Sequence, residues 1–171
     1  MKDVKKRLIS ELVKNSRKSD RELAKVLGVS QPTVSRTRIQ LEEQGYISEY
    51  TAIPDFSKLD YKILALTFVK LKSTMPPEQI EQAKRIINEA TKTMTINVSM
   101  LERGLGLGSD GVIMSYHKDY SRYLEFMNLL KRVGEEFLSL DEVKSFLIDL
   151  QDEVRFIPFT LSLVANDIAR A

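Results

Sequence analysis

The stretch DRELAKVLGVSQPTVSRTRIQLEEQGYI, residues 20–47, decides the fold of the N-terminal part of the chain. Gly28 is suited to end a first helix in a left-handed cap, and Ser30 is a good N-cap for a second helix that carries Pro32 in its first turn. The small residue Ala24, four positions before the glycine, lets two helices cross closely. This spacing predicts a helix-turn-helix, a DNA-binding motif, whereas a helical packing module is the plainer alternative.

The second helix of the motif carries a polar face. A helical wheel centred on Val34 and Leu41 leaves polar side chains pointing outward, and the positive helix N-terminus is itself a phosphate site. A long basic side chain in this position, Arg36, is suited to a guanine. The predicted contacts to bases and phosphates are Ser30, Gln31, Thr33, Ser35, Arg36 and Gln40.

Two positions of this helix do not fit the wheel. Arg38 falls near the buried side and Ile39 near the exposed side. The simpler interpretation is that Ile39 packs on a neighbouring element and that Arg38 lays its aliphatic stem across the core. The alternative is that Ile39 contacts a thymine methyl group.

The remainder of the first 53 residues completes a winged helix-turn-helix domain. Apolar residues at helical spacing predict a helix before residue 15, and the alternating YISEYTAI, residues 46–53, predicts a wing. Residues 1–50 contain 11 Lys/Arg and 7 Asp/Glu, whereas residues 51–171 contain 15 and 17. The basic half is therefore the half expected to touch a polyanion.

A second domain is predicted for residues 61–171, after a linker at residues 54–60. Periodicity predicts strands at 62–72, 94–100, 112–117 and 144–150, and helices at 76–90 and 120–133. The order β-α-β-β-α-β is that of a ferredoxin-like domain, which makes the fold class α+β. Met94, Ile96, Val98 and Met100 are expected on one side of their strand. The C-terminal extension 151–171 is left open between strand and helix.

The first predicted strand of this domain has apolar residues on both faces. Two helices cover only one face of a four-stranded sheet, so KILALTFV, residues 62–69, requires a cover on the other. A partner subunit is the simplest cover, and the chain's own C-terminal segment is the alternative. A homodimer would set two recognition helices about one helical turn of DNA, ~34 Å, or a multiple apart.

The stretch GLGLGSDG, residues 104–111, contains a G-x-G-x-x-G pattern. A dinucleotide site needs this pattern between a strand and a helix, with an acidic residue about 20 positions later. Here it lies between two predicted strands, and Lys131 occupies the later position. We therefore expect no NAD site, and glycines that serve a hairpin.

The composition of the chain bears on metal sites, cofactors and cellular location. The chain has no cysteine and one histidine, His117, so no metal site and no cofactor are expected. No apolar run reaches the roughly 20 residues of a membrane span, and no secretory signal is visible. A cytoplasmic protein without a membrane partner is expected.

The motifs RELAKVLGVSQPTVSR, LEEQGYISEYTAI and GSDGVIMS, in this order and spacing, resemble the Lrp/AsnC (feast/famine) family of transcriptional regulators, in an archaeal-like form. The resemblance covers roughly residues 3–150. It implies a sequence-specific regulator of double-stranded DNA that is not an enzyme. It also implies a homodimer, with assembly as far as an octamer, and an amino acid or related effector at Gly108, Ser109 and Asp110.

The chain departs from the family pattern at several positions. Thr37-Arg38 replaces a basic-then-aliphatic pair, no glycine occurs near Asp60-Tyr61, and extra glycines precede the effector turn. Two other functions remain open on the same plan. One is a tetrapyrrole (siroheme) decarboxylase-like enzyme, a reaction expected to use several histidines and arginines, whereas His117 is the single histidine of the sequence. The other is a nucleoid-type DNA-binding protein without an effector.

Overall fold

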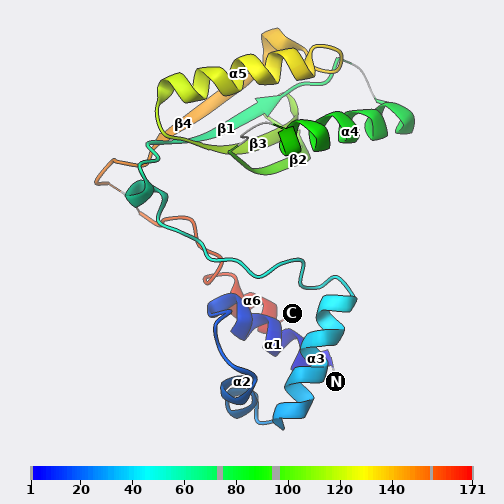
Figure 1. Ribbon diagram of the computed structural model, residues 1–171, viewed down its shortest axis with the longest axis vertical. Coiled ribbons are helices and arrows are strands. Elements are labelled where there is room, and N and C mark those ends of the chain that lie inside the picture. The colour runs from blue at the N-terminus through cyan, green and yellow to red at the C-terminus, as the bar shows by residue number, and fades with distance from the viewer. Residues whose placement is uncertain (1, 73–74, 94–96, 155, 171) are drawn as a thin grey trace. The chain divides into compact units, whose positions relative to one another are not determined.

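The computed structural model of the chain describes residues 2–72, 75–93, 97–154 and 156–170 (Figure 1). Its contacts form two units: residues 1–54 with 155–171, called here the helical unit, and residues 55–154, called the sheet unit. This division differs from the predicted one, in which the C-terminal extension belonged to the second domain.

The elements follow the predicted order with one helix added at the end. They are α1 Lys2–Lys14, α2 Asp20–Leu27, α3 Gln31–Glu43, the 3-10 helix η1 Phe56–Leu59, β1 Ile63–Val69, α4 Pro77–Thr93, β2 Val98–Gly106, β3 Ser109–His117, α5 Tyr120–Gly134, the 3-10 helix η2 Leu140–Glu142, β4 Lys144–Asp149 and α6 Ala165–Arg170.

Helices α1, α2 and α3 enclose the core of the helical unit. That core consists of the buried residues Leu8, Leu12, Leu23, Ala24, Leu27, Val34 and Leu41. Local chemistry fixes the start of α2, because the Ser19 backbone N–H donates to the Glu22 carboxylate and the Ser19 hydroxyl accepts from the Glu22 N–H.

Residues 46–53, predicted as a wing, contain no strand. The segment runs as irregular chain after α3, so the predicted strand pairing is wrong. The undecided C-terminal extension ends in α6, which packs along α1. Ala165 of α6 is fully buried, and so is Ser10 of α1, a residue out of phase with the Leu8 and Leu12 side chains that face the core.

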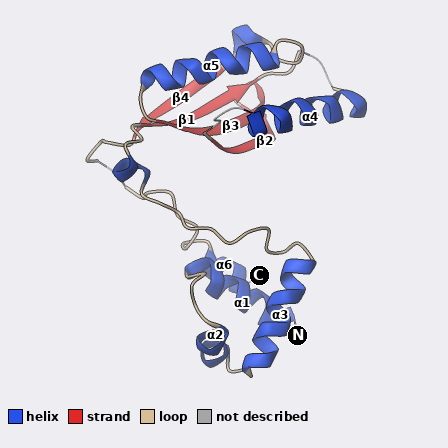
Figure 2. Ribbon diagram, viewed as in Figure 1, coloured by secondary structure: helices blue, strands red, loops and turns tan. Residues whose placement is uncertain are grey.

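The sheet unit has four antiparallel strands in the order β2-β3-β1-β4, the ferredoxin-like order (Figure 2). Helices α4 and α5 lie on the same side of the sheet. On that side Ala65, Thr67 and Ile113 are almost fully buried. On the other side Phe146 keeps 63% of its surface exposed and Leu66 is half-buried, so the prediction of a strand with two apolar faces is confirmed.

The hairpin between β2 and β3 is shorter than the glycine pattern indicated. Only Leu107 and Gly108 lie between the strands, with φ angles of 54° and 72°. This is the backbone of a tight two-residue hairpin turn. The other glycines of the stretch therefore belong to strands, and Asp110 lies on β3 rather than in the turn.

The apolar residues of 94–100 were predicted to lie on one side of their strand, and this is wrong for the part of the segment that the structure describes. Met94 lies outside the described residues, as does Ile96. A register shift separates Val98, which is opposite Ser115, from Met100, which is opposite Met114. Adjacent residues of β3 point to opposite faces, so Val98 and Met100 do not share a side.

Candidate functional site

The turn before α3 has the geometry of a helix-turn-helix. Gly28 adopts φ 70°, and its N–H donates to the Ala24 carbonyl oxygen. The Ser30 hydroxyl caps α3 by accepting from the Thr33 N–H, and it also contacts the Thr33 hydroxyl at 2.8 Å. Val34 and Leu41 are fully buried, which holds α3 against α1 and α2 with its polar side outward.

The structure brings the six predicted DNA contacts together on α3 and its N-cap. Five of them are exposed and Ser35 is half-buried. No carboxylate among the described residues lies within ion-pair distance of Arg36, so its guanidinium is available. The same helix face carries Ile39, which is 50% exposed.

Arg38 has a role that the sequence did not indicate. Its guanidinium binds the Asp20 carboxylate of α2 at 2.6 and 3.0 Å and lies 3.4 Å from the Tyr50 hydroxyl. Tyr50 donates in turn to Glu42, and burial together with this hydrogen bond raises the pKa of the Tyr50 phenol. The network ties α2, α3 and the segment after α3 together. The departure at Thr37-Arg38 and the acidic start of α2 were its only sequence signals.

Some cations of the helical unit are held by neighbouring side chains, whereas others are free of ion pairs within the part of the chain that the structure describes. Lys14 and Lys18 both bind Glu11, and these contacts lower the pKa of the Glu11 carboxyl. Other basic side chains are exposed and have no ion-pair partner among the described residues. These are Arg17, Arg21, Lys25, Arg36 and Arg170.

The predicted effector residues have unequal environments. Gly108 is exposed, whereas Ser109 is 7% exposed. The Asp110 carboxylate accepts from the Leu71 N–H at 3.0 Å and pairs with Lys70 at 3.3 Å. The Leu71 hydrogen bond and then Lys70 hold the pKa of Asp110 below its usual range. The charge of Asp110 is thus already matched by Lys70.

His117 is buried in the sheet unit. Its Nε2 atom lies 2.8 Å from the Ser115 hydroxyl, and its ring packs edge-to-face on Tyr123. Burial lowers the pKa of His117. In the described part of the chain, no three His, Cys, Asp or Glu side chains gather as a metal site requires. None of the helices within those residues has the length and apolar character of a membrane span.

Comparison with known proteins gives matches to both units. A family model for winged helix-turn-helix DNA-binding domains matches residues 1–48. An uncharacterized HTH-type transcriptional regulator of Pyrococcus furiosus is 35% identical over 106 residues, which are 62% of this chain and 66% of that protein, just under two thirds of its length. The HTH-type transcriptional regulator PH0061 of Pyrococcus horikoshii, also uncharacterized, is 30% identical over 146 residues, covering 82% of this chain and 93% of that protein.

Solved structures share the fold of this chain. The crystal structure of PH0061 matches with a TM-score of 0.70 at 25% identity, covering 91% of this chain and 95% of that one. An AsnC family transcriptional regulator from Agrobacterium tumefaciens matches with a TM-score of 0.66 at 19% identity, over 90% and 92%. A transcriptional regulator from Neisseria meningitidis, solved as an L-Met complex, matches with a TM-score of 0.68 at 18% identity, over 98% and 97%. The predicted fold class is confirmed.

Proposed function

We propose that this chain, which belongs to the Lrp/AsnC family of HTH-type transcriptional regulators, reads operator DNA through α3 and changes its DNA binding when a small molecule binds its sheet unit. The observation that carries the first part is the exposed polar face of α3 over a buried core. The chain is a DNA-binding regulator by its family, and the relatives it matches are named as regulators.

The proposed roles follow from position on α3. Ser30, Gln31 and Thr33 lie at the helix N-terminus, where phosphates are favoured, and Ser35, Arg36 and Gln40 face the base edges. Because Arg38 is held by Asp20, it sets the orientation of α3 and does not read bases. The exposed cations of α2, Arg21 and Lys25, contact phosphates.

Substitution of Arg36 tests the recognition role. Arg36→Ala removes a guanidinium that can bind a guanine at two points, so operator affinity is expected to fall about tenfold to a hundredfold, with relaxed preference at one base position. Competition footprints on base-substituted operators measure both effects. Arg85→Ala, an exposed change on α4 of the sheet unit, is the matched control. Unchanged affinity and unchanged base preference in Arg36→Ala would contradict the proposal.

A homodimer is proposed through the open face of the sheet. That face carries apolar side chains in register on three strands, among them Leu66 opposite Met114 and Phe146. Phe146→Glu introduces a charge there and is expected to shift sedimentation from dimer to monomer, because an ion in an apolar interface loses its hydration. Glu125→Gln, on the exposed side of α5, serves as control. A monomeric wild-type chain at micromolar concentration contradicts this part.

The effector part of the proposal places a ligand near Gly108, Ser109 and Asp110. An L-Met complex of a structural relative supports an amino acid as the ligand class. Thermal unfolding with L-methionine and the other common amino acids is the first test, since a ligand of the folded state raises the apparent stability. Footprints with and without each binder then report the effect on DNA. Ligand-independent footprints across the panel point instead to a nucleoid-type protein.

A further inference from the structure

An apolar cavity lies between α4 and the sheet. Its volume is about 460 Å³. Two helices and two strands form its walls: Ile80, Ala83 and Ile87 of α4, Leu101 of β2, Ile113 of β3 and Val133 of α5. Among the described residues α4 makes only sparse contact with the strands. Packed interiors contain few voids larger than a water molecule, whereas small-molecule sites occupy roughly 300–1,000 Å³. The cavity has the size and lining of a ligand site.

Four charged residues also line this cavity: Lys84, Glu102, Arg103 and Asp110. Arg103 is opposite Gly111 in the β2–β3 ladder, so it points to the helix side, while its neighbour Glu102 alternates to the other face. Asp110 is matched by Lys70, and Lys84 pairs with Glu81. No carboxylate among the described residues lies within ion-pair distance of Arg103. The Asp110 carboxylate feels the charge of Arg103 without pairing with it, since its hydrogen bond goes to Leu71 and its ion pair to Lys70. The lining thus combines apolar walls with a guanidinium that has no direct ion-pair partner among the described residues.

We propose that this cavity binds a small carboxylic acid with a branched aliphatic or aromatic body. The body fills the space between α4 and the sheet, and the carboxylate is held by Arg103 in a charge-assisted hydrogen bond. The cavity shares Asp110 with the proposed effector residues but is not lined by Gly108 or Ser109. The proposal stands whether or not the ligand alters DNA binding.

The test is a titration of the full-length protein, without DNA, with three probes that share one body: isocaproate, its alcohol and its amine. Calorimetry or methyl NMR gives the affinities. Isocaproate is expected to bind about tenfold more tightly than the alcohol, and the amine less tightly than either, because only the carboxylate complements Arg103. Equal binding of the three probes, or no binding of isocaproate, overturns the proposal.

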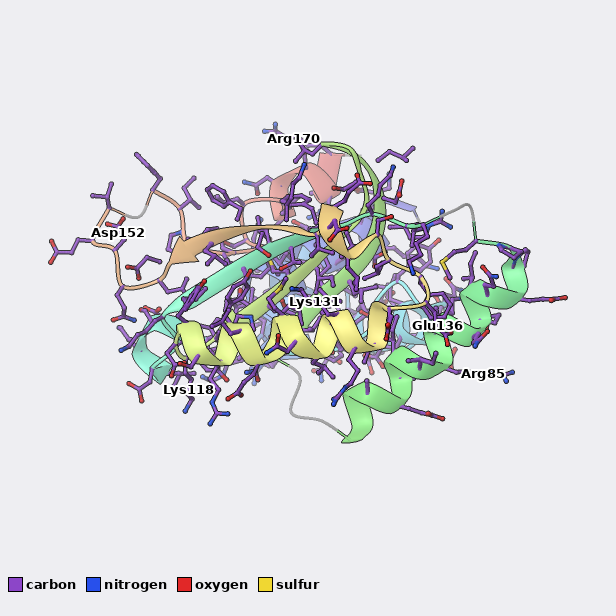
Figure 3. All side chains as sticks on the ribbon, turned by 90° about the horizontal axis from the view of Figure 1, so that it is seen from above. Arg85, Lys118, Lys131, Glu136, Asp152 and Arg170 are labelled. Carbon is purple, nitrogen blue, oxygen red and sulfur yellow. The ribbon has the colours of Figure 1, made fainter. Side chains whose placement is uncertain are left out.

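Two variants distinguish the contribution of the apolar walls to binding from that of the Arg103 charge. Ala83→Phe fills the cavity and is expected to abolish isocaproate binding while leaving the unfolding temperature unchanged or raised. Arg103→Gln is expected to remove the preference for the carboxylate over the alcohol. The control Arg85→Gln changes an exposed cation that extends from α4 away from the sheet and is expected to bind as wild type (Figure 3).

Each contrary result has a defined meaning. A lowered unfolding temperature in Ala83→Phe means that α4 packs directly on the sheet and that the cavity is absent in solution, which overturns the proposal. A carboxylate preference that survives in Arg103→Gln overturns it too. Since these measurements contain no DNA, their failure leaves the role of α3 untouched, and failure of the Arg36→Ala test leaves the cavity untouched.

Discussion

Leu107 occupies a backbone conformation that favours glycine. Its φ angle is 54°, and its side chain is 78% exposed, so no packing compensates for the strain. A left-handed conformation costs an L-residue roughly 1–2 kcal/mol. Leu107→Gly is therefore expected to raise the free energy of unfolding by about 1 kcal/mol, measured by chemical denaturation.

The control for that change lies two residues away. Leu105 is 96% exposed but sits in strand β2, where glycine only adds unfolded-state freedom. Leu105→Gly is expected to lower the free energy of unfolding by roughly 0.5–1 kcal/mol. If both substitutions destabilise equally, the left-handed turn at Leu107 is not present in solution.

His117 makes the stability of the sheet unit depend on pH. It is the chain's only histidine, and burial lowers its pKa in the folded state below the ordinary value of 6.5. The unfolded chain then binds a proton that the folded chain does not. The stabilising contribution is complete above pH 6.5 and is lost as the pH falls below it toward the folded-state pKa.

Denaturation between about pH 7.5 and pH 5.5 measures this dependence, since His is the side chain that ordinarily titrates there. The free energy of unfolding should fall with pH in the wild type and change much less in His117→Gln. An equally steep fall in His117→Gln would assign the effect to other groups.

At the scale of elements, the Arg38–Asp20 contact joins α2 to α3. Both side chains are mostly buried, with 19% and 25% exposed. Arg38→Ala leaves the Asp20 carboxylate without its partner and is expected to lower the free energy of unfolding by about 1–3 kcal/mol. Arg122→Ala breaks an ion pair whose side chains are both 62% exposed, and it should change stability far less than Arg38→Ala, because solvent screens exposed charges. Thermal unfolding of both variants makes the comparison.

The same contact shows what sequence can and cannot predict about elements. The start and end of α2 were predictable because Ser19, Glu22 and Gly28 act within a few residues of one another. The partner of Arg38 was not, since Asp20 and Tyr50 reach it from other elements. The register shift after Val98 and the absence of a strand in 46–53 likewise depend on tertiary pairing, which local periodicity does not encode.

Part of the candidate site was likewise predictable from local sequence, and part of it depends on contacts between distant residues. The exposed face of α3 followed from the spacing of Val34 and Leu41, so all six predicted contacts lie on α3 or its N-cap. The resemblance implied Asp110 as an effector residue, but it did not indicate that Lys70, which lies 40 positions earlier, pairs with its carboxylate.

At the scale of the whole molecule, the chain passes twice between the units, once before β1 and once after β4. Within the sheet unit, the segment before β1 and the segment after β4 lie side by side, because the Leu150 N–H donates to the Lys62 carbonyl oxygen at 2.8 Å. The Gln151 side chain bonds the carbonyl oxygens of Ser57 and Tyr61, each at 3.2 Å. A Gln151→Ala variant is expected to increase amide hydrogen exchange at 57–62, whereas exchange in α3 should stay unchanged. Equal exchange at 57–62 in variant and wild type would contradict this role.

The packing of α6 on α1 makes the helical unit discontinuous in sequence. Helices from both ends of the sequence form this one unit, so the sheet unit is topologically an insertion within the helical unit. Excising residues 55–154 and joining the flanks with a flexible Gly/Ser linker should therefore leave a four-helix module that folds and still binds DNA. For the same reason a tag fused after Ala171 extends from the DNA-binding unit, and its effects should appear in DNA affinity before they appear in ligand binding.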